Sequence, residues 1–176
     1  RSGSASKASA AQQGTGAVAT SRRLEFRSWD RASIGLPFGR GAGIGGVGTG
    51  CVILAKLLGA EVIACASSEE KMRRLKELGS DEVVDYSKTD WSKWAVEKYG
   101  KPQRRTYEGG VDVVVNFTGG DTWVPSLRCL KRGGKLLVCG ATAGYDPKED
   151  LRYIWSFEIE VKGSNSFYDD DLAALM

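Results

Sequence analysis

The stretch Gly41-Ala42-Gly43-Ile44-Gly45-Gly46-Val47-Gly48 decides how this sequence folds. It contains the spacing Gly-x-Gly-x-x-Gly at Gly43, Gly45 and Gly48, and a helical pattern and then a short apolar strand follow it. The first glycine permits a tight turn, the second lets the backbone approach a pyrophosphate, and the third lets the helix pack closely on a sheet. Because a helix N-terminus presents free N–H groups and a partial positive charge, this order predicts the phosphate-binding turn of a dinucleotide-binding fold.

Beyond the glycine stretch, apolar strand patterns alternate with helical patterns along the chain. We expect helices over 48–59, 68–78, 90–99, 121–131, 149–156 and 170–176. We expect strands over 61–66, 82–86, 111–117, 135–139 and 157–162. This alternation predicts an α/β fold with a doubly wound parallel sheet, whose strands all end at one edge. The turns that follow the strands, at 41–48, 66–68, 117–120 and 140–142, should therefore line one crevice.

Three polar groups have structural interpretations in this pattern. Ser67 and Glu70 form a Ser-x-x-Glu capping box at the start of a helix. Asp121 is expected to cap another helix. The acidic run 169–171 favours a helix N-terminus, where it complements the helix dipole, over a metal site.

Composition narrows the chemistry that is available to the chain. Its 176 residues include no histidine, which removes Ser-His-Asp and Cys-His catalysis and histidine-ligated zinc. The four cysteines are widely spaced in apolar patterns, so we expect small buried thiols in a reducing compartment, the cytoplasm. They form no Cys-x-x-Cys pair, so we expect no zinc bound by this chain. No apolar run has the length that crosses a membrane, so no membrane partner is expected.

The net charge of +3 is unevenly spread along the sequence. Residues 1–40 hold seven basic and two acidic residues, whereas residues 41–176 hold 18 and 20. The later part is nearly neutral, so nucleic acid is not an expected partner. Residues 1–40 also lack a regular apolar period, and Gly35 and Pro37 interrupt what would be a strand. We therefore expect a disordered or atypical segment over 1–40, with no strand before the glycine turn, and an incomplete dinucleotide-binding domain over 41–176.

Residues 41–170 resemble the coenzyme-binding Rossmann domain of the medium-chain dehydrogenase/reductases. These are the zinc-dependent alcohol dehydrogenases and their zinc-free quinone oxidoreductase relatives. Five blocks carry the resemblance in the family's order: GIGGVGTG, LAKLLGAEVIACASSEEKMRRLKELGSDEVVDY, GVDVVVNFTGG, SLRCLKRGGKLLVCGATAG and EIEVKGSN. The resemblance implies the NAD(P)-binding domain of an oxidoreductase that transfers hydride between nicotinamide and an alcohol, aldehyde, ketone or quinone.

The same resemblance implies a set of cofactor-binding residues and no catalytic residue in this chain. The pyrophosphate would meet Gly43, Gly45, Gly46, Val47 and Gly48. The ribose and nicotinamide would border Phe117, Thr118, Gly119, Gly140, Ala141 and Thr142. The carboxamide would meet backbone groups of Ser164, Asn165 and Ser166.

The choice between NADP and NAD depends on the end of the second strand. NAD selectivity usually rests on an acidic residue there, but this sequence has Ala66. Ser67, Ser68 and Lys71 follow, and with Tyr86 after the next strand they resemble the NADPH-using quinone oxidoreductases. A lysine with hydroxyl groups attracts a 2′-phosphate, so we expect NADP, with NAD as the second choice. In the alternative interpretation, the first serine only caps its helix and the lysine is solvated.

The resemblance also implies a catalytic domain that is split between an N-terminal half and a C-terminal return. Residues 1–40 do not resemble the N-terminal half, and we expect the C-terminal return to be missing from this chain. We therefore expect the small-molecule substrate to bind through a missing catalytic domain, the full-length protein to form a homodimer, and the chain alone not to turn over. A non-catalytic nucleotide-binding fragment is the alternative. An S-adenosylmethionine methyltransferase is a third interpretation. Its fold needs an acidic residue at the end of the second strand to bind the ribose, and this sequence has Ala66 there.

Three interpretations of residues 1–40 stay open. One is a reading-frame error upstream of about residue 40. Family members often have Gly-Tyr-Leu-Thr-Ala shortly before the coenzyme domain. GC-rich codons for that segment, read one base later, give Ala-Thr-Ser-Arg-Arg, which is the sequence of residues 19–23 here. The second is a transit peptide, since the segment is rich in arginine and serine. The third is a genuine disordered extension or linker. The nucleotide sequence upstream distinguishes the first from the others.

Overall fold

The computed structural model describes residues 34–36, 46–165 and 168–175, which form a six-stranded sheet in the order β3-β2-β1-β4-β5-β6. All neighbouring strands are parallel. The strands are β1 (Ile34–Leu36), β2 (Val62–Ala66), β3 (Glu82–Asp85), β4 (Val111–Asn116), β5 (Leu130–Val138) and β6 (Glu160–Gly163). The helices are α2 (Gly46–Leu57), α3 (Glu69–Glu77), α4 (Trp91–Tyr99), α5 (Trp123–Cys129), α6 (Leu151–Ser156) and α7 (Asp169–Leu175), with a 3-10 turn η1 (Gly120–Thr122) before α5.

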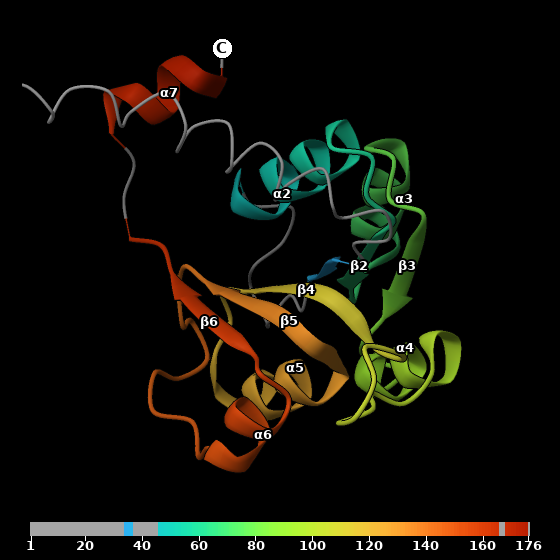
Figure 1. The fold of residues 1–176 in the computed structure, drawn as a ribbon. Helices are drawn as coiled ribbons and strands as arrows, with labels where there is room; N and C mark the ends of the chain where they lie inside the picture. The colour runs from blue at the N-terminus through green and yellow to red at the C-terminus, as the bar shows by residue number, and fades with distance from the viewer. Residues whose placement is uncertain (1–33, 37–45, 166–167, 176) are drawn as a thin grey trace, which may run out of the picture.

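The helices cover both faces of the sheet. Figure 1 shows α2 and α3 on one side, and α4, α5 and α6 on the other. The chain moves outward from β1 to β3, returns across the sheet, and then moves outward again from β4 to β6. This is the doubly wound arrangement expected from the alternation, and its direction of winding changes between β1 and β4. Within the described residues, no helix is long and apolar enough to span a membrane.

The expectation that no strand precedes the glycine turn is wrong. β1 lies in the centre of the sheet, where Ile34 pairs with both Val62 of β2 and Val113 of β4. Gly35 lies inside this strand, and the strand ends just before Pro37. Without β1, the inner edges of β2 and β4 would have unpaired backbone groups in the middle of a sheet. The three residues of β1 pair with three residues of β2 and two of β4, although they are too few to give an apolar period.

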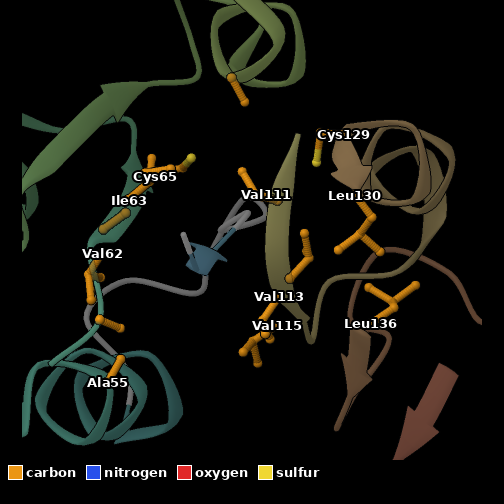
Figure 2. Packing of buried hydrophobic residues seen from close by; sticks show 14 of the residues in the cluster. Ala55, Val62, Ile63, Cys65, Val111, Val113, Val115, Cys129, Leu130 and Leu136 are labelled. Carbon is orange, nitrogen blue, oxygen red and sulfur yellow. The ribbon is translucent and has the colours of Figure 1, made fainter. Parts of the chain in front are cut away.

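The core lies on both faces of β2 and β4. Every residue of β2 is buried, and Val113 and Val114, which point to opposite faces, are both fully buried. Figure 2 shows Val62 and Ile63 of β2 with Val113 of β4 in this core. Leu127 of α5 and Leu136 of β5 close the core on one side, and Val52 of α2 closes it on another. Continuous apolar runs therefore correspond to strands that are covered by helices on both faces.

The expectation of buried thiols holds for two of the four cysteines. Cys65 and Cys129 are fully buried, and burial raises the pKa of the Cys129 thiol to about 12. Cys51 is partly buried, and burial, with a smaller contribution from Cys139, raises its pKa to about 11. Cys139 is exposed because it follows the last residue of β5 and lies beyond the cover of the helices. All four thiols are free.

The largest differences from the expected element boundaries lie around β5 and β6. β5 begins at Leu130 rather than at 135, because a register shift against β4 lets the strand continue through the glycine pair 133–134. The expected helix 121–131 is correspondingly shorter. β6 begins at Glu160 rather than at 157, because the chain still turns at Glu158, whose φ is 53°.

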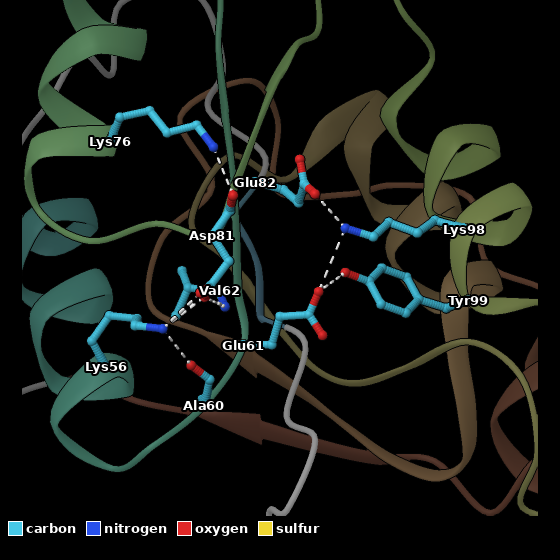
Figure 3. A network of polar contacts seen from close by, with 9 residues as sticks. All are labelled: Lys56, Ala60, Glu61, Val62, Lys76, Asp81, Glu82, Lys98 and Tyr99. Atoms are coloured by element: carbon cyan, nitrogen blue, oxygen red, sulfur yellow. Dashed lines mark hydrogen bonds and ion pairs between the residues drawn. The ribbon is translucent and has the colours of Figure 1, made fainter.

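A network of polar contacts joins three helices to the amino end of the sheet (Figure 3). The Lys56 ammonium of α2 contacts the Asp81 carboxylate at 2.7 Å and the Ala60 carbonyl at 3.1 Å. The same carboxylate accepts the Val62 N–H at 2.7 Å. Farther along, Lys98 contacts Glu82 at 2.5 Å, so α4 is fixed to β3 in the same way. The end of the glycine-turn helix is thus tied to the first residues of β2.

We expect Asp81→Asn to lower the free energy of unfolding by about 1 kcal/mol at neutral pH, since both partners are partly exposed. Burial works against the ionised carboxylate, but hydrogen bonds from Lys56 and Val62 outweigh it and hold the pKa of Asp81 below its usual range. A lowered folded-state pKa gives stability that is present above the unfolded pKa and is lost as pH falls below about 4. Urea denaturation at pH 7 and pH 3 should show a difference that shrinks at the lower pH. Glu77→Gln, on an exposed pair, is the control and should change stability by less than about 0.5 kcal/mol.

Candidate functional site

The carboxyl ends of the strands meet at one edge of the sheet, as parallel strands must. Ala66, the last residue of β2, pairs with Asp85 of β3. On the other side of β1, Asn116 of β4 pairs with Val138 of β5, which pairs with Gly163 of β6. The expected crevice therefore has two halves, separated by β1 at the point where the winding changes direction. Ligands of open parallel sheets bind at such a point.

The first turn of α2 faces this edge with small residues. Gly46 and Val47 are exposed, and Gly48 is buried where the helix meets the sheet. A Cβ added to Gly46 would meet no atom of the described residues within 4 Å, so within this part of the chain there is open space beside Gly46. Exposed backbone at a helix N-terminus fits an anionic group such as a pyrophosphate. Two further expected residues, Gly43 and Gly45, lie outside the described residues.

At the end of β2, the structure brings together two of the predicted residues. The Ser67 hydroxyl donates to the Tyr86 hydroxyl at 3.0 Å. Ala66 is 2% exposed, so its methyl group packs inside and the exposed polar surface begins at Ser67. The expected cap residue is wrong, because Ser68 caps α3 and accepts the Lys71 N–H at 3.4 Å. Ser67 is therefore not engaged as a cap and belongs to the exposed polar group beside Tyr86.

The charged groups next to Ser67 in the sequence are Glu69, Glu70 and Lys71 in the first turn of α3, and the exposed Glu69 makes no ion pair within the described residues. The Glu70 carboxylate contacts the Arg74 guanidinium at 2.7 Å along α3, so its charge already has a partner. Lys71 makes no ion pair within the described part of the chain, and it is partly exposed in the first turn of α3. A phosphate near Ser67 would meet a cation and hydroxyl groups.

The loops after β4 and β5 form one unit. The Ala143 N–H donates to the Thr118 carbonyl at 2.7 Å, and the Gly120 N–H donates to the Gly144 carbonyl at 2.9 Å. Gly119 has a φ of 66°, and an added Cβ would lie 2.2 Å from the Gly144 oxygen. Gly140 and Ala141 are partly exposed beside this contact, and Thr142 is exposed. The predicted residues 117–119 and 140–142 are therefore neighbours, at the place where a nicotinamide ribose is expected.

Sequence reasoning missed the residue that holds this loop pair. Asn116 is fully buried, and its side-chain oxygen accepts the N–H groups of Thr118 at 2.9 Å and Gly119 at 2.8 Å. Its side-chain nitrogen donates to the hydroxyls of Thr122 at 3.0 Å and Ser126 at 2.9 Å. The available signal was a polar residue at the end of a run of valines, followed by two hydroxyl residues at helical spacing. A buried amide with all these partners fixes the loop backbone.

The remaining predicted residues lie at the outer part of the edge. The Ser164 N–H donates to the Val138 carbonyl at 2.8 Å, which places Ser164 beside the end of β5, and Asn165 is exposed next to it. Ser166 lies outside the described residues. Asp121 is exposed in η1 and makes no cap, which corrects the sequence-based expectation, since η1 follows Gly119 and α5 follows Thr122. The acidic run 169–171 does occupy the first turn of a helix, α7.

No group of three or more histidine, cysteine, aspartate or glutamate residues in the described ranges could hold a metal ion. What the edge offers is an open helix N-terminus, a hydroxyl pair with a nearby lysine, and a rigid pair of glycine-containing loops. These groups fit the pyrophosphate, the adenosine ribose and the nicotinamide half of a dinucleotide.

Comparison with known proteins agrees with this geometry. The zinc-binding dehydrogenase family matches residues 46–176. The chain is 28% identical over 131 residues to a crotonyl-CoA reductase of Streptomyces avermitilis, covering 69% of this chain and 29% of that protein. A solved NAD-dependent alcohol dehydrogenase is 30% identical, with a TM-score of 0.70, and the match covers 88% of this chain and 41% of that one. A 2-octenoyl-CoA carboxylase reductase solved with NADP and 2-octenoyl-CoA is 26% identical, with a TM-score of 0.65, and the match covers 82% of this chain and 34% of that one.

The chain thus spans about a third of the length of these relatives, and the matching part contains the glycine-turn helix and the parallel sheet. Membership of a dehydrogenase family removes the methyltransferase alternative. The chain belongs to the zinc-binding dehydrogenases, a branch of the medium-chain dehydrogenase/reductases, and corresponds to their NAD(P)-binding Rossmann domain.

Proposed function

We propose that the chain binds NADP(H) for an oxidoreductase that transfers hydride between nicotinamide and an alcohol, aldehyde, ketone or quinone. The observation that carries the preference for NADP(H) is the arrangement at the end of β2. Ala66 is buried where an acid would select NAD, and the Ser67–Tyr86 hydroxyl pair is exposed beside it. Lys71 is the cation near this pair, and Glu70 is already paired with Arg74.

We expect Lys71→Gln to weaken NADPH binding about ten-fold and NADH binding by less than about two-fold, because only NADPH carries the 2′-phosphate. Isothermal titration calorimetry with each cofactor measures both dissociation constants. The matched control is Lys93→Gln on α4, an exposed lysine that contacts Asp90 at 3.5 Å and should leave both constants unchanged. Tighter binding of NADH than of NADPH by the unmodified chain would contradict the proposed preference.

A second candidate function, for these 176 residues by themselves, is cofactor binding without turnover. The matched part of the chain covers 29% of the crotonyl-CoA reductase and 34% of the 2-octenoyl-CoA carboxylase reductase. We therefore expect the purified chain to bind NADPH and to leave its absorbance at 340 nm unchanged when aldehydes or quinones are added. Oxidation of NADPH by this chain would reject the binding-only role and would support a complete enzyme.

We further propose that the full-length protein binds its small-molecule substrate through a catalytic domain and forms a homodimer. Edge strand β6 supports the second point, because its four residues are exposed and its outer backbone groups can pair with another strand. Four free thiols, two of them buried, support a reducing compartment such as the cytoplasm.

A further inference from the structure

A groove lies at the amino edge of the sheet, opposite the crevice described above. The loop 100–110 precedes β4, and the turn 156–159 precedes β6, so both lie where strands begin. Between them is a cavity of about 830 Å³, which a second cavity of about 460 Å³ continues. Gln103, Arg104 and Ser156 line both. This volume is sufficient for a small organic ligand.

Hydrogen bonds hold both walls of the groove. In the loop, the Gly110 N–H donates to the Gly100 carbonyl at 2.9 Å, and the Gln103 N–H donates to the Glu108 carbonyl at 3.2 Å. On the opposite wall, the Gly133 N–H donates to the Phe157 carbonyl at 2.8 Å. These backbone hydrogen bonds therefore give both walls of the groove a defined conformation.

The charges of the groove are not balanced. The acidic groups of Glu158 and Asp150 already have partners, since Arg132 contacts the first at 2.6 Å and Arg152 contacts the second at 2.8 Å. Three exposed cations, Lys101, Arg104 and Arg105, make no ion pair with any described residue. Of the acidic residues that line the groove, only Glu108 is left to oppose them. The surplus positive charge favours an anion.

A flat aromatic surface stands beside these cations. Trp155 lines the larger cavity and is 70% exposed. Two nearby aromatic residues pack on the core instead. Tyr153 of α6 stacks on Phe157, which follows the helix, with ring centroids 5.2 Å apart. An exposed indole next to two adjacent arginines is the combination that binds a planar ring and a phosphate together.

We propose that this groove binds a phosphate monoester that carries a flat ring, of which a mononucleotide is the simplest example. Arg104 and Arg105 bind the phosphate, and the ring stacks on Trp155. The site is independent of the dinucleotide crevice, since the two lie at opposite ends of the strands. It does not depend on the cofactor preference proposed above.

The test uses AMP as the probe and the purified 176-residue chain. Calorimetry gives the dissociation constant of AMP. The indole N–H signal of Trp155 in proton NMR spectra, assigned with the Trp155→Phe variant, shows whether AMP binds next to this side chain. We expect the double variant Arg104→Gln/Arg105→Gln to raise the dissociation constant at least about ten-fold. We expect Trp155→Ala to raise it at least about five-fold and to leave the weaker binding of inorganic phosphate unchanged.

Two control variants distinguish AMP binding in this groove from AMP binding elsewhere on the chain. Lys71→Gln perturbs the dinucleotide crevice, and Arg73→Gln removes an exposed arginine on α3, so both should change AMP binding in the groove by less than about two-fold. Equal weakening by Arg73→Gln would mean general surface attraction and would overturn the proposal. An unchanged Trp155 signal, or a response to an RNA oligomer with none to AMP, would overturn it as well.

Discussion

The Gly119→Ala variant is expected to lose about 3 kcal/mol of unfolding free energy and to lose measurable NADPH binding. The added methyl group would lie 2.2 Å from the Gly144 carbonyl oxygen, which is backbone and cannot rotate away. Gly119 has a φ of 66° and a ψ of −149°, a backbone region that essentially only glycine occupies, so alanine there costs at least about 1 kcal/mol. Separating the loops also breaks the bonds from Gly120 and Ala143, at about 1 kcal/mol each. Urea denaturation followed by circular dichroism measures the loss, and calorimetry measures binding.

Gly59→Ala is the matched control for this prediction. Gly59 also has a positive φ, of 79°, but a Cβ there would meet no atom within 4 Å among the residues that the structure describes. Its substitution should cost only the conformational strain, about 1 kcal/mol, and should leave cofactor binding unchanged. If the two variants are equally stable, the contact between the two loops contributes nothing, and the loops do not form one unit.

Asn116→Leu should give a loss of comparable size, of about 3 kcal/mol. Leucine has a similar shape, but it leaves the N–H groups of Thr118 and Gly119 buried without their acceptor. Each buried unsatisfied group costs about 1–3 kcal/mol, and the hydroxyls of Thr122 and Ser126 lose a donor as well. The released loop should also bind NADPH more weakly. Thermal unfolding and calorimetric titration of the same preparation report both effects.

Ser126→Ala tests whether weaker NADPH binding in Asn116→Leu comes from the released loop or from the loss of any one polar contact in the network. It removes one hydroxyl on α5 and leaves both bonds from the loop N–H groups to Asn116 in place. We expect a loss of about 1 kcal/mol and little change in NADPH affinity. A strong loss of binding in Ser126→Ala, or none in Asn116→Leu, would show that Asn116 does not position the loop.

Sequence patterns predicted the parts of the fold in which local signals and packing agree. β2 and β4 are apolar runs covered on both faces, and the strong turn signals at Gly59 and Gly79 mark helix ends with positive φ. The fold class and the edge of the sheet that carries the crevice followed from these elements. The family resemblance predicted cofactor contacts at Ser67, Tyr86 and the two glycine-containing loops. The structure shows that Ser67 contacts Tyr86 and that the two loops contact each other, and their contact with a cofactor stays a prediction.

The features that were missed depend on contacts distant in sequence. β1 has three residues, one of them Gly35, and it is a strand because β2 and β4 both need a partner. From the sequence, Ser67 and Ser68 are equally good candidates for the N-cap of α3. Only the structure shows that Ser68 takes this role. Asn116 continues a strand pattern, and only the fold places Ser126 and Thr122 against its amide.

The central position of β1 has a consequence for how the domain opens in solution. Within the described residues, the ladder between the β3-β2 half and the β4-β5-β6 half passes through these three residues alone. We expect the sheet to open by transient separation of these halves, and amide hydrogen exchange in β2 and β4 would report it. A dinucleotide that contacts Ser67 in one half and Gly140 in the other would tie the halves together across this ladder. Part of its binding energy would then appear as slower exchange in the sheet interior, far from any atom that it touches.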